Sequence, residues 1–155
     1  MHKVKKIVAG VLLTVSVMFC LTGCSEKLYA DFTVNDSEIT VSYDIGGGYD
    51  FFYDDTYFYV GNRGTTPAIS GTFASEESFD FYTYAVEVDE KCSLLGISEV
   101  FNNEFITFSQ EDESGDSVFV HIFRVHDTNL FAVLMSHDGE EDLLAQKDFI
   151  AFDVE

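Results

Sequence analysis

The sequence predicts an α+β fold in which an antiparallel sheet packs against helices. Short alternating segments, rich in aromatic and branched residues, recur on both sides of the middle of the chain, as in antiparallel strands. One central stretch, residues 76–95, instead has helical periodicity. The last strand-like segments are apolar on both faces, so further layers must cover them on both sides.

The N-terminus has the three parts of a bacterial export signal. Lys3, Lys5 and Lys6 provide the positive charge, and an apolar run over residues 7–21 follows them. This run is shorter than the roughly 20 residues that span a bilayer, which favours a cleaved leader. It ends in Leu21-Thr22-Gly23-Cys24, where a small residue immediately precedes a cysteine.

These residues resemble the leader and lipobox of bacterial lipoproteins. The resemblance implies that signal peptidase II cuts between Gly23 and Cys24 and that the Cys24 thiol carries a covalent diacylglycerol, with no other cofactor. It also implies a lipid-anchored protein on the extracytoplasmic face of a bacterial cell membrane. The alternative is an ordinary secretory signal, or an uncleaved anchor, in which Cys24 is incidental.

The expected organisation is a leader (1–23), a lipidated N-terminus with a short tether (24–30) and a single globular α+β domain (31–155). The extended tether would reach roughly 20 Å, so the domain should lie close to the membrane. Because Cys20 leaves with the leader and Cys24 carries lipid, Cys92 would remain as the one thiol and no internal disulfide could form.

Two hairpins are predicted at the start of the domain. In the first, residues 32–34 and 39–43 alternate apolar and polar around an Asn-Asp-Ser turn. In the second, residues 51–53 and 57–60 are aromatic runs on either side of an Asp-Asp pair. A short strand over residues 68–73 follows.

Residues 76–95 are expected to form a long helix. Ser75 can cap its start, acidic residues follow at the positive end of the helix dipole, and Gly96 is placed to end it. Because residues 79–88 are also rich in aromatic and branched side chains, a buried strand is the alternative, and with it an all-β barrel or sandwich. The helix would bury one apolar stripe with spacings of three and four, made of Phe81, Tyr84, Ala85, Val88, Cys92 and Leu95.

Three strands over residues 105–109, 117–126 and 130–136 are expected to form a C-terminal meander. A register that pairs residue 126 with residue 130 places Phe119, His121 and Phe123 on one face with Phe131. A terminal helix is expected near residues 139–152.

The terminal helix is predicted from Asp138 and Glu141, which form a start like a capping box. The order of strands, long helix, meander and terminal helix over residues 31–155 resembles the PsbP-like fold, a small α-β-α sandwich. This resemblance rests on element order; it implies a binding or accessory module and carries over no catalytic residue.

Catalytic motifs are not found in the sequence. Gly46-Gly47-Gly48 lacks the Lys and Ser/Thr of a nucleotide-binding loop, and no serine lies in a G-x-S-x-G setting. Cys92 lies on the apolar stripe and is interpreted as a core thiol. Of 8 Lys and Arg residues three belong to the leader, and the rest are too few to bind nucleic acid. The sequence therefore predicts a protein that is not an enzyme.

Four residues are candidate cation ligands. Asp112 and Asp116 supply carboxylates around a glycine, although their spacing does not match an EF-hand loop. In the assumed register, His121 and His137 lie diagonally on one sheet face. The alternatives are solvated acidic turns, a core histidine and a histidine at a strand end.

Tyr49, Tyr53, Tyr57 and Tyr59 crowd near the triple glycine and form either an exposed binding patch or part of the sheet core. The chain has a net charge of −20, which would attract a basic protein or peptide. We therefore expect a monomeric, membrane-anchored, non-enzymatic binding or accessory module. The alternatives are a calcium- or zinc-dependent envelope protein or enzyme, and an immunity or inhibitor protein that binds a basic partner.

Overall fold

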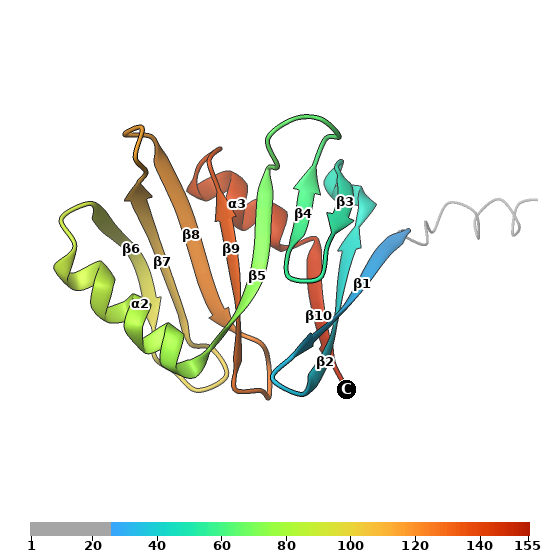
Figure 1. Cartoon of the computed structure of the whole chain (residues 1–155), viewed down its shortest axis with the longest axis horizontal. Helices are drawn as coiled ribbons and strands as arrows, with labels where there is room; N and C mark the ends of the chain where they lie inside the picture. The colour runs from blue at the N-terminus through green and yellow to red at the C-terminus, as the bar shows by residue number, and fades with distance from the viewer. Residues whose placement is uncertain (1–25) are drawn as a thin grey trace, which may run out of the picture.

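The computed structural model describes residues 26–155, which contain 10 strands and 2 helices in two antiparallel sheets (Figure 1). The predicted α+β class with an antiparallel sheet is confirmed, and the all-β alternative is excluded by the helices. The smaller sheet has the order β1-β2-β10 and contains Lys27–Val34, Ser37–Asp44 and Ile150–Val154. The larger sheet has the order β3-β4-β5-β9-β8-β7-β6 and contains Asp50–Tyr53, Phe58–Gly61, Ile69–Ser75, Leu130–Ser136, Ser117–Arg124, Phe105–Glu111 and Cys92–Ser98.

The seven-stranded sheet is the middle layer of the fold. Helix α2 (Glu76–Val88) covers one face at the β6 end, and the small sheet covers the other face together with α3 (Glu140–Lys147) (Figure 1). Each face therefore has its own core. Under α2 this core includes Phe79, Ile106, Ile122 and Phe131, whereas Phe32, Val41 and Phe58 lie in the core between the sheets. The prediction that both faces must be covered is confirmed.

The first hairpin forms as predicted but begins earlier. Strand β1 starts at Lys27, inside the segment expected to be a tether, and pairs along its whole length with β2. Asn35 and Asp36 connect the two strands with φ of 49° and 64°. Positive φ at both central residues matches the right-handed twist of the flanking strands, which fixes the register of this hairpin.

The central helix is shorter than predicted and buries a different stripe. It ends at Val88, and residues 92–95 belong to strand β6, which pairs with β7. Phe79 and Val86 point inward, and the Phe79 ring stacks on Phe131 with centroids 4.2 Å apart. Phe81, Tyr84 and Val88, expected in the core, are exposed.

The predicted register of β8 and β9 is wrong by one residue. Phe131 lies opposite Arg124, and the Val125 N–H donates to the Leu130 carbonyl at 2.9 Å. A shift of one residue exchanges the two faces of a strand. His121 therefore lies opposite Leu134, on the face toward the small sheet.

Arg124 explains this register. Its buried guanidinium donates to Glu104 at 2.9 Å, to Glu76 at 3.3 Å and to the Thr128 carbonyl at 2.8 Å, and it lies over the Phe131 ring. The Arg124 side chain thus has to point toward α2. The pattern of apolar residues contains no sign of this requirement.

The C-terminal segment is a short helix followed by a strand. Helix α3 covers Glu140–Lys147, and the last part of the predicted helix is strand β10, which pairs with β2. The expected capping bond does not form, because Gly139 is the N-cap and makes no side-chain bond. Pairing with β2 lets Ile150 and Phe152 pack on the core between the sheets.

Candidate functional site

The candidate site residues fall into three groups with different outcomes. The lipobox, Leu21, Thr22, Gly23 and Cys24, lies outside the described residues, so lipidation of Cys24 stays a prediction. The candidate cation ligands and the tyrosines both lie within the described part of the chain. Cys92, expected on the helix, is a half-buried free thiol at the start of β6, and burial raises its pKa.

Asp112 and Asp116 share the β7–β8 turn, but the four candidate cation ligands do not form one cluster. Asp112 closes the β7–β8 turn, where its Oδ1 accepts from the N–H groups of Ser114 and Asp116 at 2.8 Å and 3.0 Å. His137 is exposed just beyond the end of β9. Within residues 26–155, no group of three or more His, Cys, Asp or Glu side chains could hold a metal ion.

His121 is a buried core histidine. Its Nδ1 is 2.8 Å from the Thr107 hydroxyl, and its ring packs against Phe105 and Phe123 with centroids 5.6 Å and 5.1 Å away. Burial, and to a smaller extent the nearby Lys147 ammonium, lower its pKa from 6.5 to about 4. The neutral ring is therefore the native form at neutral pH.

The four tyrosines divide between the two faces of the β3–β4 hairpin. Tyr49 and Tyr53 lie on the side of the small sheet, where Tyr49 packs on the core and Tyr53 meets Phe32 edge to face. Tyr57 and Tyr59 lie on the opposite side and stack with centroids 6.2 Å apart. They do not form one patch.

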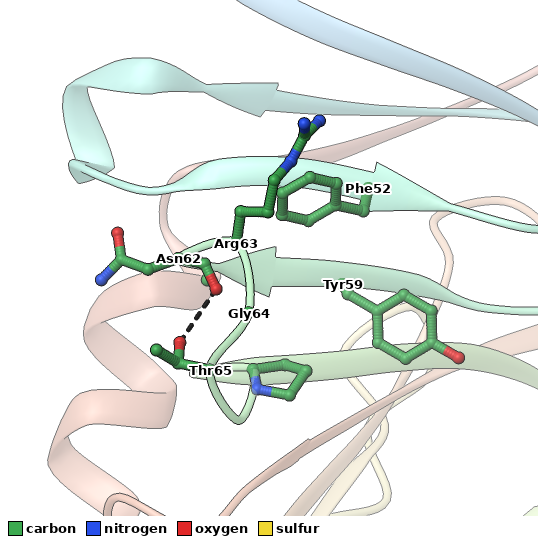
Figure 2. A pocket seen from close by; sticks show the side chains of 8 residues that line it. Phe52, Tyr59, Asn62, Arg63, Gly64 and Thr65 are labelled. Atoms are coloured by element: carbon green, nitrogen blue, oxygen red, sulfur yellow. Dashed lines mark hydrogen bonds between the residues drawn. The ribbon is translucent and has the colours of Figure 1, made fainter.

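The face that carries Tyr59 contains an open pocket with a volume of about 420 Å³ (Figure 2). Phe52 and Tyr59 lie opposite each other on β3 and β4 and form its floor. Helix α2 covers the other end of this face of the sheet, so it does not cover the pocket (Figure 1). The pocket is lined by Phe52, Tyr59, Gly61, Asn62, Arg63, Gly64, Thr65 and Pro67.

The β4–β5 loop forms the wall of this aromatic pocket. The Thr65 N–H and hydroxyl both donate to the Asn62 carbonyl, at 3.2 Å and 2.9 Å, and close a tight turn (Figure 2). Gly64 lies in this turn at φ of 82°, a conformation that other residues rarely adopt. One backbone bond and one side-chain bond therefore close the turn that forms the wall.

Arg63 is the cation of the aromatic pocket. Its guanidinium carbon lies 5.7 Å from the Phe52 ring centroid, and Figure 2 shows the two side chains next to each other. None of the ion pairs among the described residues involves Arg63. An exposed guanidinium on a ring keeps most of its donors free for a ligand.

Asp54 accepts a hydrogen bond from the Tyr59 hydroxyl at one end of the pocket floor. Its carboxylate accepts from the Tyr59 hydroxyl at 3.4 Å, and the N–H groups of Thr56 and Tyr57 lower its pKa. Partial burial and this carboxylate raise the pKa of Tyr59. Tyr59 therefore stays protonated, and the hydrogen bond from its hydroxyl to Asp54 fixes the position of its ring.

Of the residues that line the pocket, sequence reasoning found Tyr59 but missed Phe52, Arg63 and Pro67. Strand alternation carries part of the missing signal, because Phe52 is out of phase with Phe51 and Tyr53 and must face the other side. The position of Arg63 depends on the conformation of the loop, which the sequence pattern does not determine.

No family model matches the chain, and comparison with curated proteins and with solved structures gives no match either. Among residues 26–155, neither helix has the length and apolar character needed to cross a bilayer. The geometry of the site is thus the basis for assigning a function.

Proposed function

We propose that the protein is a lipid-anchored, non-enzymatic binding module on the extracytoplasmic face of a bacterial membrane. The observation that carries the binding function is the aromatic pocket, which is open, has a wall closed by a tight turn and is covered by no other element among residues 26–155. Ligand sites are typically concave and apolar with a few convergent polar groups. The lipobox resemblance supports the anchor.

The pocket fits a small, flat, mainly apolar ligand that carries a carboxylate or a similar acceptor. The rings of Phe52 and Tyr59 and the adjacent Pro67 provide apolar surface, on which a planar group can pack. Arg63 provides a planar cation at the rim, which suits bidentate recognition of a carboxylate. The rest of the strongly acidic surface repels anions, so affinity depends on both parts of the ligand.

The proposed anchor would hold the domain near the bilayer. Only Ser25 and Glu26 separate Cys24 from the start of β1 at Lys27. A folded domain on so short a link would meet ligands close to the membrane surface. The cation-dependent alternative has no supporting observation within residues 26–155, where no group of three or more His, Cys, Asp or Glu side chains could hold a metal ion.

The binding function can be tested by thermal unfolding of the full-length protein with a panel of aromatic carboxylates, each paired with its neutral amide. A carboxylate at about a hundred times its Kd should raise Tm by roughly 5–10 °C. Arg63→Gln should remove the preference for the carboxylate, and Phe52→Ala should remove the shift for both partners. The matched control is Lys91→Gln, which removes an exposed cation far from the pocket and should leave the shifts unchanged. Equal shifts in wild type and Phe52→Ala would contradict the proposal.

A further inference from the structure

A second surface of the molecule is unusually apolar. Exposed large apolar side chains concentrate at the α2 end of the large sheet, where Phe81, Tyr84 and Val88 are 65%, 63% and 58% exposed and Phe101 is 72% exposed. Leu94 and Ile97 of the neighbouring strand β6 are also exposed. We call these six residues the α2–β6 surface.

The exposed side chains of α2 are not the ones that pack on the core of the domain. The inward side of α2 is already filled by Phe79 and Val86, which pack on the large sheet. Phe81, Tyr84 and Val88 recur at spacings of three and four on the opposite side, so they form a second stripe that points to solvent. Contiguous exposed apolar patches of this kind mark interaction sites.

Strand β6 continues the surface beside the helix. It is the last strand of the large sheet and pairs only with β7 in the described structure (Figure 1). Leu94 and Ile97 lie opposite Phe108 and Ile106, which pack under α2, so both side chains are on the helix side of the sheet. The apolar residues of α2 and β6 thus lie on the same side of the molecule.

Exposed acidic residues lie close in the sequence to the residues of the α2–β6 surface, and we call them its acidic rim. Residues 76–101 contain seven acidic residues and a single basic one, Lys91. Glu76 is paired with Arg124, whereas the other six acids are exposed and make no ion pair among those of residues 26–155. These six are Glu77, Asp80, Glu87, Asp89, Glu90 and Glu99.

We propose that the α2–β6 surface is a docking site for a basic amphipathic segment of another protein. Apolar side chains of the segment would cover Phe81, Tyr84 and Leu94, and its Lys or Arg residues would meet the acidic rim. This charge complementarity selects the partner. A second copy of the chain would place one acidic rim against another, and an anionic membrane would be repelled by it.

The partner is recognised through side chains and not as an added strand. A β-bulge shifts the β6 register between Leu94 and Gly96, and Lys91 precedes the strand. Bulges and lysines are the features by which natural edge strands avoid pairing with other chains. The segment therefore lies across the helix and the strand.

The test is a binding titration of the full-length protein with a short fluorescein-labelled peptide of lysine, leucine and phenylalanine. We expect fluorescence anisotropy to show saturable binding that weakens as salt is raised. A peptide with glutamate in place of each lysine should not bind, and neither should one with serine in place of each apolar residue. Equal binding of the glutamate peptide would overturn the proposal.

Variants locate the binding. Phe81→Ser with Tyr84→Ser should weaken binding roughly tenfold or more, as for aromatic anchors in other interfaces. Glu77→Lys with Glu87→Lys should weaken it most at low salt. Matched controls at other exposed positions are Tyr29→Ser on β1 and Glu113→Lys in the β7–β8 turn, which should bind as wild type does. All six substituted positions are exposed, so each variant should fold, and its Tm verifies this.

Two further measurements decide between occupants. Sedimentation velocity of wild type should show a monomer; self-association that Phe81→Ser with Tyr84→Ser abolishes would assign the surface to a second copy and overturn the proposal. Vesicles of anionic lipid should not compete with the peptide. Competition that the same variant removes would assign the surface to a membrane and would also overturn it.

Discussion

His121 shows how a single buried side chain couples stability to pH. The ring packs against Phe105 and Phe123, and its burial lowers its pKa from 6.5 to about 4. Between these two values the unfolded chain binds a proton that the native protein does not bind. Acidification through this range therefore favours unfolding, and the stability present above pH 6.5 is lost as the pH falls toward 4.

We expect His121 to account for a loss of about 2–3 kcal/mol in the free energy of unfolding between pH 7 and pH 4. Urea unfolding at a series of pH values should show a shallower loss in His121→Gln than in wild type. NMR titration of the His121 ring in wild type tests the same point without a substitution and should show protonation near pH 4. His137→Gln is the matched control, and an equal change of slope in it would contradict the assignment.

Arg124 is the other residue whose surroundings decide local structure. One guanidinium joins the start of α2 through Glu76, the β6–β7 loop through Glu104 and the β8–β9 turn through Thr128. The bond to Arg124 lowers the pKa of Glu104, so this carboxylate stays ionised below its usual range. A buried cation persists only with such partners, and here they come from three separate segments.

The contact between strands β4 and β5 depends on the Phe58 ring, which packs against Gly71. Phe58 lies opposite Gly71, and a Cβ at position 71 would overlap the Phe58 ring. We expect Gly71→Ala to lower the free energy of unfolding by about 1–3 kcal/mol, because overpacking displaces the ring from a full core. Chemical denaturation measures this directly.

Gly96 provides the matched comparison for Gly71. It also lies in a strand, but a Cβ there would meet the Phe105 ring at 3.5 Å, an ordinary contact. Gly96→Ala should therefore change stability little. A similar loss in both variants would show that the cost belongs to strand glycines in general and not to the Phe58 contact.

The sequence predicted elements well where one pattern was present and poorly where two overlapped. Strand β9 covers residues 130–136 as expected, and the first hairpin has the expected turn. The central segment contains two apolar stripes, one with Phe79 and Val86 and one with Phe81, Tyr84 and Val88. Periodicity shows that both exist but does not show which one meets the sheet.

The candidate site was predictable to a similar, partial extent. Aromatic crowding around Tyr57 and Tyr59 indicated the correct hairpin, but the two faces of that hairpin were not separated. The pairing of His121 with His137 depended on a register that Arg124 determines. Tertiary contacts of this kind leave no local pattern, so the sequence alone could not supply them.

At the scale of the whole molecule, the domain has a core on each face of a central sheet and no disulfide among its described residues, in which Cys92 is free. Its described elements already begin at Lys27. The proposed anchor must then act through the few residues before β1. The folded domain and the lipid should be separable by a single substitution.

We expect Cys24→Ala to abolish incorporation of labelled palmitate and to move the protein out of the membrane fraction, with Tm of the domain unchanged. Cys20→Ala, in the expected leader, is the matched control and should keep both the label and the membrane location. Label retained in Cys24→Ala would refute the proposed anchor, whereas loss of label in both variants would point to failed export.

The start of β1 and the α2–β6 surface lie at opposite ends of the long axis of the domain (Figure 1). A lipid attached just before β1 would hold that end of the domain at the bilayer. The α2–β6 surface and its acidic residues would then lie at the end away from the membrane. The protein would then diffuse in the plane of the membrane with its α2–β6 surface exposed to solvent. Binding of a basic segment to the α2–β6 surface would concentrate the partner along the cell surface. Its distance from the membrane would be set by the length of the long axis of the domain.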